Sequence, residues 1–124
     1  MSEDDLSHIR ILIAEDQPIN QFILKKILGH WKNSPTMVGD GEEAVEAVKQ
    51  NSYDLVFLDI HMPIMGGYEA ARQIQIIQPK LPLVAISAAV SPFSHDEAKE
   101  AGLRAFIGKP YQSHEILELI KELA

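Results

Sequence analysis

Five polar residues of this chain stand at the ends of short apolar runs, and their types suit the handling of a metal ion and a phosphoryl group. Glu15 and Asp16 follow the first run, Asp59 a later one, and Ser87 and Lys109 the last two. Clustered carboxylates are hard oxygen ligands for Mg²⁺, which keeps several waters and needs few protein ligands. A carboxylate beside such an ion can attack phosphorus and form an aspartyl phosphate, while a lysine and a hydroxyl bind the phosphoryl oxygens.

Each of these residues, taken alone, also has a simpler structural explanation. Glu15, Asp16 and Ser87 could cap the helices that follow them, which is a common role of an acid or a hydroxyl in this position. Lys109 could be an exposed residue before a proline. Asp59 is harder to explain in this way, because an ionised carboxylate at the end of a buried strand is costly unless a cation joins it. The presence of all five at strand ends favours the functional interpretation.

The apolar runs that carry these residues have the length and composition of β-strands. Three of the four stronger runs are nearly continuous in apolar residues, which is typical of strands covered on both faces. A weaker run lies between the first two strong ones. The predicted strands are Ile9–Ala14, Thr36–Gly39, Asp54–Leu58, Leu83–Ile86 and Leu103–Ile107.

Segments with apolar residues at helical spacing alternate with these strands. The first ends near Gly29, the second follows the turn Asp40–Gly41, and the third stops before Pro79. The fourth begins at Ser91–Pro92, where a capping serine precedes a proline at the first helical position, and the fifth covers residues 116–123. Five such units predict a doubly wound α/β domain with a parallel sheet, in which ligands bind beyond the carboxyl ends of the strands.

The composition is that of one ordinary globular domain. The chain has 124 residues, 46% of them hydrophobic, and no cysteine, which excludes thiol catalysis, disulfides and cysteine-based zinc sites. Eighteen acidic and 11 basic residues give a net charge of −7, which argues against direct contact with nucleic acid or an anionic membrane. No apolar run is long enough to span a membrane, and the acidic start is unlike a signal peptide. We expect a loose tail over residues 1–8 and a folded domain over 9–124.

Four motifs, in this order along the chain, resemble the receiver domain of two-component response regulators: ILIAEDQPIN, DLVFLDIHMPIMGGYEA, LVAISA and AGLRAFIGKP. The resemblance covers the chain from about Ile9 to Ala124, and the first two motifs are similar to receivers attached to hybrid histidine kinases. It implies a flavodoxin-like (βα)₅ fold with strand order 2-1-3-4-5. It also implies a cytoplasmic phosphorylation-activated switch rather than an enzyme, with Mg²⁺ as cofactor and a histidine kinase or histidine phosphotransfer domain as partner.

The resemblance implies a role for each acidic residue of the candidate site. Asp59 would accept the phosphoryl group from the partner's phosphohistidine. Asp59, Asp16 and the backbone carbonyl of His61 would bind Mg²⁺, with Glu15 acting through a bound water. His61 and Ala89 occupy two variable positions that influence how fast such proteins lose the phosphate, and the direction of their effect stays open.

The resemblance also implies a switch. Lys109 would pair with the phosphoryl group, and its peptide bond to Pro110 is expected to be cis. Ser87 would donate a hydrogen bond to a phosphoryl oxygen and move inward. Phe106, which replaces a common tyrosine and lacks its hydroxyl, would turn inward with it by packing alone. The change would reach the surface of the last two strand–helix units, where a phosphorylation-dependent dimer could form.

Two other functions fit part of the pattern. A haloacid-dehalogenase-like phosphatase also has a nucleophilic aspartate after an apolar strand, but it needs a second acid two residues later, where this chain has His61. A pseudo-receiver that only binds partners would lack Asp59, the acidic pair or Lys109, and all of these are present. Whether the domain acts alone or belongs to a hybrid kinase stays open, as do its kinase, stimulus and output.

Overall fold

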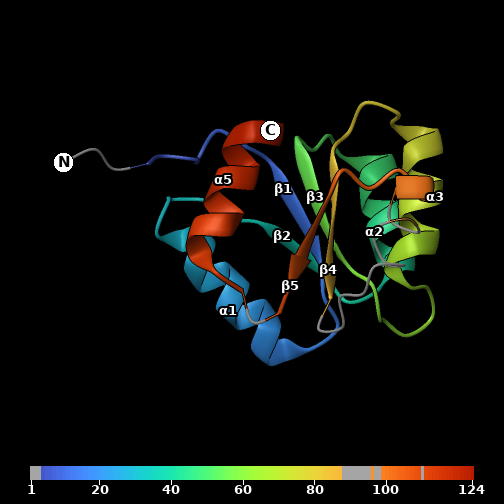
Figure 1. Cartoon of the computed structure of the whole chain (residues 1–124), viewed down its shortest axis with the longest axis horizontal. Helices are drawn as coiled ribbons and strands as arrows, with labels where there is room; N and C mark the ends of the chain where they lie inside the picture. The colour runs from blue at the N-terminus through green and yellow to red at the C-terminus, as the bar shows by residue number, and fades with distance from the viewer. Residues whose placement is uncertain (1–3, 88–95, 97–98, 110) are drawn as a thin grey trace.

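A five-stranded parallel sheet forms the centre of the molecule (Figure 1). The computed structural model describes residues 4–87, 96, 99–109 and 111–124. The strands are β1 (Ile11–Ala14), β2 (Thr36–Val38), β3 (Leu55–Asp59), β4 (Leu83–Ser87) and β5 (Ala105–Gly108), in the spatial order β2-β1-β3-β4-β5. Every neighbouring pair is parallel. The predicted fold class and strand order are therefore confirmed, and the winding of the chain reverses between β1 and β3.

Four helices are formed by the described residues: α1 (Pro18–Gly29), α2 (Gly41–Gln50), α3 (Gly67–Ile77) and α5 (Ser113–Leu123). As predicted, the first helix ends at Gly29 and the second follows Asp40. A proline begins α1, and the carboxylate of Asp40 accepts the Glu43 N–H at the start of α2 at 2.8 Å. The start predicted for a fourth helix at Ser91–Pro92 lies outside the described residues. No helix within the described part of the chain is both long and apolar enough to cross a membrane.

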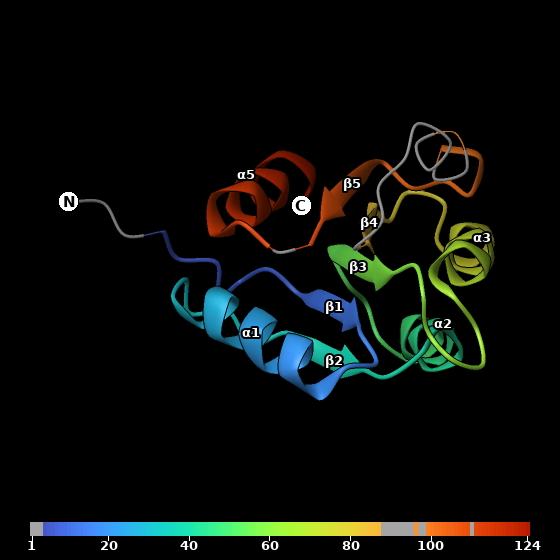
Figure 2. The same ribbon diagram turned by 60° about the horizontal axis from the view of Figure 1, so that its bottom comes forward.

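The helices cover the two faces of the sheet in pairs, with α1 and α5 on one face and α2 and α3 on the other (Figure 2). Successive strand residues point to opposite faces, so each strand contributes to two cores. The α1–α5 core contains Ile11, Ile13, Leu55, Phe57, Val84 and Ile86, and the α2–α3 core contains Leu12, Ala14, Val56, Leu58, Leu83 and Ala85. Burial on both faces explains why β1 is apolar throughout and why β3 and β4 are apolar up to their final residues.

The segment predicted as an N-terminal tail contacts the α1–α5 face. Leu6 is 5% exposed, and its N–H donates to the carbonyl of Trp31 at 2.8 Å. The amide of Asn33 donates to the carbonyls of Leu6 and Ile9 at 2.7 and 2.8 Å. These bonds tie the residues before β1 to the turn after α1. The boundary at residue 8 between tail and domain stays a prediction.

Candidate functional site

The carboxyl ends of four strands bring the predicted site residues to one edge of the sheet. Glu15 follows β1, Asp59 ends β3, Ser87 ends β4, and Lys109 follows β5. The register pairs Asp59 with Ile86, and the N–H of Lys109 donates to the carbonyl of Ser87 at 2.9 Å. Because the strands are parallel, their ends coincide, and residues distant in the sequence meet there.

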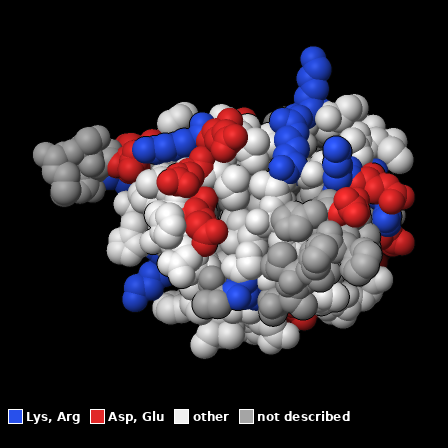
Figure 3. Space-filling model, in the orientation of Figure 1, with Lys and Arg blue, Asp and Glu red and all other residues white. Residues whose placement is uncertain are grey.

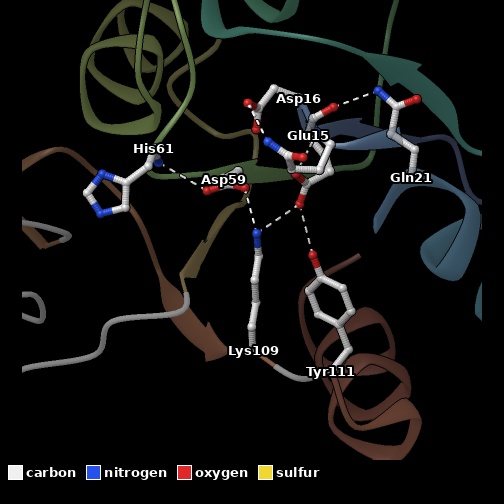
Figure 4. A network of polar contacts seen from close by, with 8 residues as sticks. Glu15, Asp16, Gln21, Asp59, His61, Lys109 and Tyr111 are labelled. Carbon is white, nitrogen blue, oxygen red and sulfur yellow. Dashed lines mark hydrogen bonds and ion pairs between the residues drawn. The ribbon is translucent and has the colours of Figure 1, made fainter. Parts of the chain in front are cut away.

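The ammonium group of Lys109 bridges two of the carboxylates (Figure 4). Its Nζ lies 2.8 Å from Asp59 Oδ2 and 3.1 Å from Glu15 Oε1. The hydroxyl of Tyr111 donates to the same Glu15 oxygen at 2.9 Å. The chain segment that leaves β5 therefore supplies two donors to the acidic residues at the ends of β1 and β3.

Glu15 and Asp16 are held by the turn into α1. The N–H of Gln17 donates to Glu15 Oε2 at 3.1 Å, and its side-chain amide lies 3.3 Å from Asp16 Oδ2. The amide of Gln21 donates to the Glu15 backbone carbonyl at 2.6 Å. Gln17 is the capping residue of α1, and no side chain forms a capping hydrogen bond there. The simpler explanation of Glu15 and Asp16 as helix caps is therefore wrong.

Asp59 is buried, with 3% of its surface exposed, at the point where the chain turns from β3 toward α3. Its Oδ1 accepts the backbone N–H of His61 at 3.0 Å, while the His61 side chain is exposed. Gly67 begins α3 directly behind this turn, and its N–H donates to the carbonyl of Ile60 at 3.0 Å. A Cβ atom at Gly67 would overlap the Asp59 backbone carbonyl, so this close approach requires glycine.

The same turn contains an unfavourable backbone conformation. Ile64 has a φ of 67° and is 79% exposed. The left-handed region is rare for β-branched residues because their side chain crowds the backbone there. Such conformations persist where surrounding structure imposes them, and they gather at functional sites.

Burial and hydrogen bonding act against each other on Asp59 and Lys109. Burial raises the pKa of Asp59 above its ordinary value, because it outweighs the hydrogen bonds from Lys109 and the His61 N–H, and the charge of Glu15 adds to the rise. Burial lowers the pKa of Lys109, but its bonds to Asp59 and Glu15 outweigh that effect, so the pKa is raised. Lys109 therefore stays charged.

Glu15 has the opposite shift to Asp59. Burial raises its pKa, but the donors Gln17 N–H, Tyr111 hydroxyl and Lys109 together outweigh it, so the Glu15 pKa lies below its usual value. The pKa of Tyr111 is raised well above its usual range by burial and by the neighbouring negative charge of Glu15. The Tyr111 hydroxyl therefore stays protonated at neutral pH and can donate its hydrogen bond to Glu15.

The three acidic residues form a group that can hold a metal ion. Glu15, Asp16 and Asp59 each offer a carboxylate oxygen, and these oxygens lie within 4.8 Å of one another. Asp16 is partly exposed and the other two are buried. Three carboxylates beside one ammonium group leave an excess of negative charge, and hard oxygen donors of this kind fit Mg²⁺.

The two predicted switch residues lie on adjacent strands. Ser87 is buried at the end of β4, and Phe106 on β5 pairs with Ala85 and is half-buried against the α2–α3 core. Their movement stays a prediction. Two other predicted features, the side chain of Ala89 and the peptide bond to Pro110, fall on residues that the structure does not describe.

The sequence patterns did not point to three further residues around the acidic site, Gln17, Gln21 and Tyr111. A signal for Tyr111 was present, because it comes two residues after Lys109 on a segment that leaves the same edge of the sheet. Nothing in the sequence indicates that the hydroxyl reaches Glu15, since that contact spans 96 residues of chain.

The fold and the site together define this chain as a doubly wound α/β protein with carboxylates and a lysine at the switch point of its sheet. Comparison with known protein families identifies the family. Residues 11–121 match the family model of the response regulator receiver domain, and the chain belongs to this family. The predicted resemblance is therefore confirmed. Membership also excludes the haloacid-dehalogenase-like alternative.

Relatives and solved structures agree with this assignment. The chain is 31% identical over 120 residues to the sensory/regulatory protein RpfC of Xanthomonas campestris; the match covers 94% of this chain but 16% of that protein. It resembles the receiver domain of sensor histidine kinase PA1611 from Pseudomonas aeruginosa, solved with magnesium in the active-site cleft: 26% identity, TM-score 0.86, 93% and 96% of the two chains covered.

A third neighbour is a structure of a complex. It is the co-crystal structure of the histidine phosphotransfer protein Ypd1 and the receiver domain of Ssk1 from Saccharomyces cerevisiae, with 29% identity and a TM-score of 0.88. The match covers 99% of this chain and 91% of the other. Receiver domains of this family thus occur both within sensor kinases and in complexes with phosphotransfer proteins.

Proposed function

We propose that this chain is a phosphorylation-activated switch that accepts a phosphoryl group on Asp59 from a histidine kinase or a histidine phosphotransfer domain. The observation that carries the proposal is the Lys109 bridge, which holds an ammonium group 2.8 Å from a buried aspartate beside two further acids. A cytoplasmic location goes with the proposal, because phosphohistidine donors are formed from ATP inside the cell.

The transfer breaks the P–N bond of the phosphohistidine and forms a P–O bond to an Asp59 carboxylate oxygen. The electron pair of the broken bond returns to the imidazole nitrogen. Lys109 and the Ser87 hydroxyl take the phosphoryl oxygens. Glu15, Asp16, Asp59 and the His61 backbone carbonyl would hold Mg²⁺, which offsets negative charge on the phosphoryl oxygens when bound. The product stays on the chain, so the domain regulates rather than turns over a substrate, although its own groups promote both gain and loss of the phosphate.

The output surface in this proposal is the region of β5 and α5, with the fourth helix predicted from Ser91–Pro92. A groove of about 210 Å³ between β5 and α5 is lined by Phe106 and Leu119 and by three acids of α5. Figure 3 shows acidic side chains gathered over α5, a charge that opposes direct binding of nucleic acid. Since Phe106 lines the groove and also packs on the core, its inward movement would reshape this surface. A phosphorylation-dependent dimer through it stays a prediction.

The exposed face of α1 is the surface that we propose for the phosphodonor. Ile19, Phe22 and Ile23 are 69%, 64% and 38% exposed, and their i, i+3, i+4 spacing places them on one face of the helix. The helix begins three residues after Glu15, so this apolar face adjoins the acidic site. A helix that is apolar on its outer face as well as its inner one is typical of a binding surface.

Incubation with acetyl phosphate and Mg²⁺ tests the acceptor. The wild-type chain is expected to take up acid-labile phosphate, and Asp59→Asn to take up none. Asp54→Asn is the matched control, because Asp54 is an exposed aspartate just before the other end of β3. Uptake by Asp59→Asn at the wild-type level would overturn the proposal.

A second experiment tests the donor surface. Phe22→Asp is expected to slow transfer from a phosphorylated histidine phosphotransfer protein by about tenfold or more, since central apolar anchors each contribute on the order of 2 kcal/mol to binding. Its labelling by acetyl phosphate should be unchanged. Ile76→Asp, at an 81% exposed isoleucine on α3, is the control. Equal slowing by both variants would contradict a specific role of α1.

A further inference from the structure

Two donors share one oxygen of Glu15, and they come from the same short segment. Lys109 Nζ lies 3.1 Å and the Tyr111 hydroxyl 2.9 Å from Glu15 Oε1 (Figure 4). The other carboxylate oxygen accepts the Gln17 N–H at 3.1 Å. The Glu15 residue is completely buried, so water cannot replace any of these donors without a rearrangement.

If the proposed function holds, the Lys109 ammonium group, which has three N–H donors, must be shared among more acceptors than the two carboxylates that it contacts here. It contacts Asp59 and Glu15 in this structure, and the phosphoryl group would add new oxygen acceptors on Asp59. Any movement of Lys109 toward that group weakens its contact with Glu15. A buried carboxylate that loses its cation is strongly destabilised unless other donors remain. The donors that remain for Glu15 are the Tyr111 hydroxyl and the Gln17 N–H.

The Tyr111 hydroxyl is suited to this task. It is neutral, so it does not compete with Lys109 for the phosphoryl group as a second cation would. The negative charge of Glu15 and burial keep it protonated. The tyrosine ring is half-buried and packs against the α1–α5 core, which fixes the hydroxyl in place.

We propose that Tyr111 is a positioning residue, which holds the Glu15 carboxylate toward the metal site and keeps it there when Lys109 turns to the phosphoryl group. The inference rests on the proposed function for the movement of Lys109, but the positioning of Glu15 is testable without phosphate. Outer partners of metal-binding groups commonly contribute tenfold or more to metal affinity or activity because they fix the orientation of the binding group.

Calorimetric titration of the wild-type chain and of Tyr111→Phe with Mg²⁺ alone provides the test. The variant removes only the hydroxyl and is expected to raise the Mg²⁺ dissociation constant about tenfold. Tyr53→Phe is the matched control, since the Tyr53 ring lies by Arg10, 5.5 Å from its guanidinium carbon, and takes no part in the site. It should bind Mg²⁺ like the wild type.

A double-mutant cycle separates positioning from a general structural effect. In a Glu15→Gln background, Tyr111→Phe is expected to have no further effect on Mg²⁺ affinity, because the carboxylate that it positions is gone. Equal tenfold losses in both backgrounds, or a Tyr111→Phe affinity within twofold of wild type, would overturn the inference. If the wild type takes up no phosphate while Tyr111→Phe still weakens Mg²⁺ binding, the proposed function fails and the positioning role stands.

Discussion

The ends of β1 and β3 each place a buried carboxylate beside the ammonium group of Lys109, but the surroundings of the two carboxylates differ. Glu15 after β1 accepts two hydrogen bonds, from Tyr111 and the Gln17 N–H, and forms an ion pair with Lys109. Asp59 at the end of β3 accepts two, from Lys109 and the His61 N–H. Burial therefore dominates at Asp59 and raises its pKa, while the donors dominate at Glu15 and lower it. The charge on Asp59 is the less stabilised of the two.

The backbone shows the same asymmetry. The chain passes from β1 into α1 through Gln17 and a helix-starting proline, whereas the turn after β3 holds Ile64 at a φ of 67°. The poorly stabilised charge of Asp59 and the unfavourable backbone of Ile64 thus both lie at the β3 end, whereas the buried carboxylate at the β1 end is well supplied with donors. Natural proteins keep such local costs where function requires them. This difference accords with the proposed function, in which Asp59 at the β3 end accepts the phosphoryl group and Glu15 at the β1 end supports the metal site.

The largest expected effect is a pair of stability changes of opposite sign in metal-free protein at neutral pH. Glu15→Gln should lower the free energy of unfolding by about 2 kcal/mol, because hydrogen bonds to a buried charge are weakened. Asp59→Asn should raise it by about 1 kcal/mol, because a poorly stabilised buried charge is removed. Urea unfolding in the presence of a chelator measures both. Changes of the same sign for the two variants would contradict the inferred difference between the two strand ends.

The pH dependence of the two stability changes tests the difference between Glu15 and Asp59 further. The folded-state pKa of Asp59 is raised, so its cost to stability is present at neutral pH and disappears as the pH falls through that value toward 3.8. The folded-state pKa of Glu15 is lowered, so its stabilising effect is complete above 4.5 and is lost progressively as the pH falls from there through the folded value. Urea unfolding at a series of pH values measures both differences. As the pH is lowered, the excess in free energy of unfolding of Asp59→Asn over the wild type should disappear before the deficit of Glu15→Gln does. The reverse order would contradict the assigned shifts.

The smallest expected effect concerns the backbone after β3. Ile64→Asn should raise the free energy of unfolding by roughly 0.5–1 kcal/mol, because asparagine tolerates the left-handed conformation and the lost side chain is exposed. Thermal unfolding measures the change. Ile76→Asn, at an exposed helical isoleucine, should produce no gain. An equal result for the two variants would mean that the turn after β3 carries no strain.

The sheet and its order were predictable because their determinants are local. Apolar runs of strand length, capping residues and helical spacing each act within a few residues, and burial on both faces leaves a continuous apolar pattern in β3 and β4. β3 and β4 each extend one residue further than predicted, since Asp59 and Ser87 keep their strand pairing despite being polar. The starts predicted at Ile9 and Leu103 are each two residues too early, because β1 begins at Ile11 and β5 at Ala105. Parallel strands then bring Glu15, Asp59 and Lys109 together without further information.

The features that escaped prediction depend on contacts across the fold. The burial of Leu6 requires the turn after α1, and the bond from Tyr111 to Glu15 requires the return of the chain after β5. The opposite pKa shifts of Glu15 and Asp59 depend on burial, on the donors around each carboxylate and on the charge of Glu15 beside Asp59. None of these contacts has a sequence pattern, because each involves a single pair of distant residues.

Locating the phosphoryl group in the wild-type chain most directly tests the distinction between the two strand ends. After incubation with acetyl phosphate and Mg²⁺, hydride reduction converts a phosphorylated aspartate to homoserine, and peptide mass spectrometry identifies the position. We predict homoserine at position 59 and unmodified side chains at Glu15 and Asp16. Reduction product at Glu15 or Asp16, with Asp59 unmodified, would contradict the assignment of the β3 end as the reactive one.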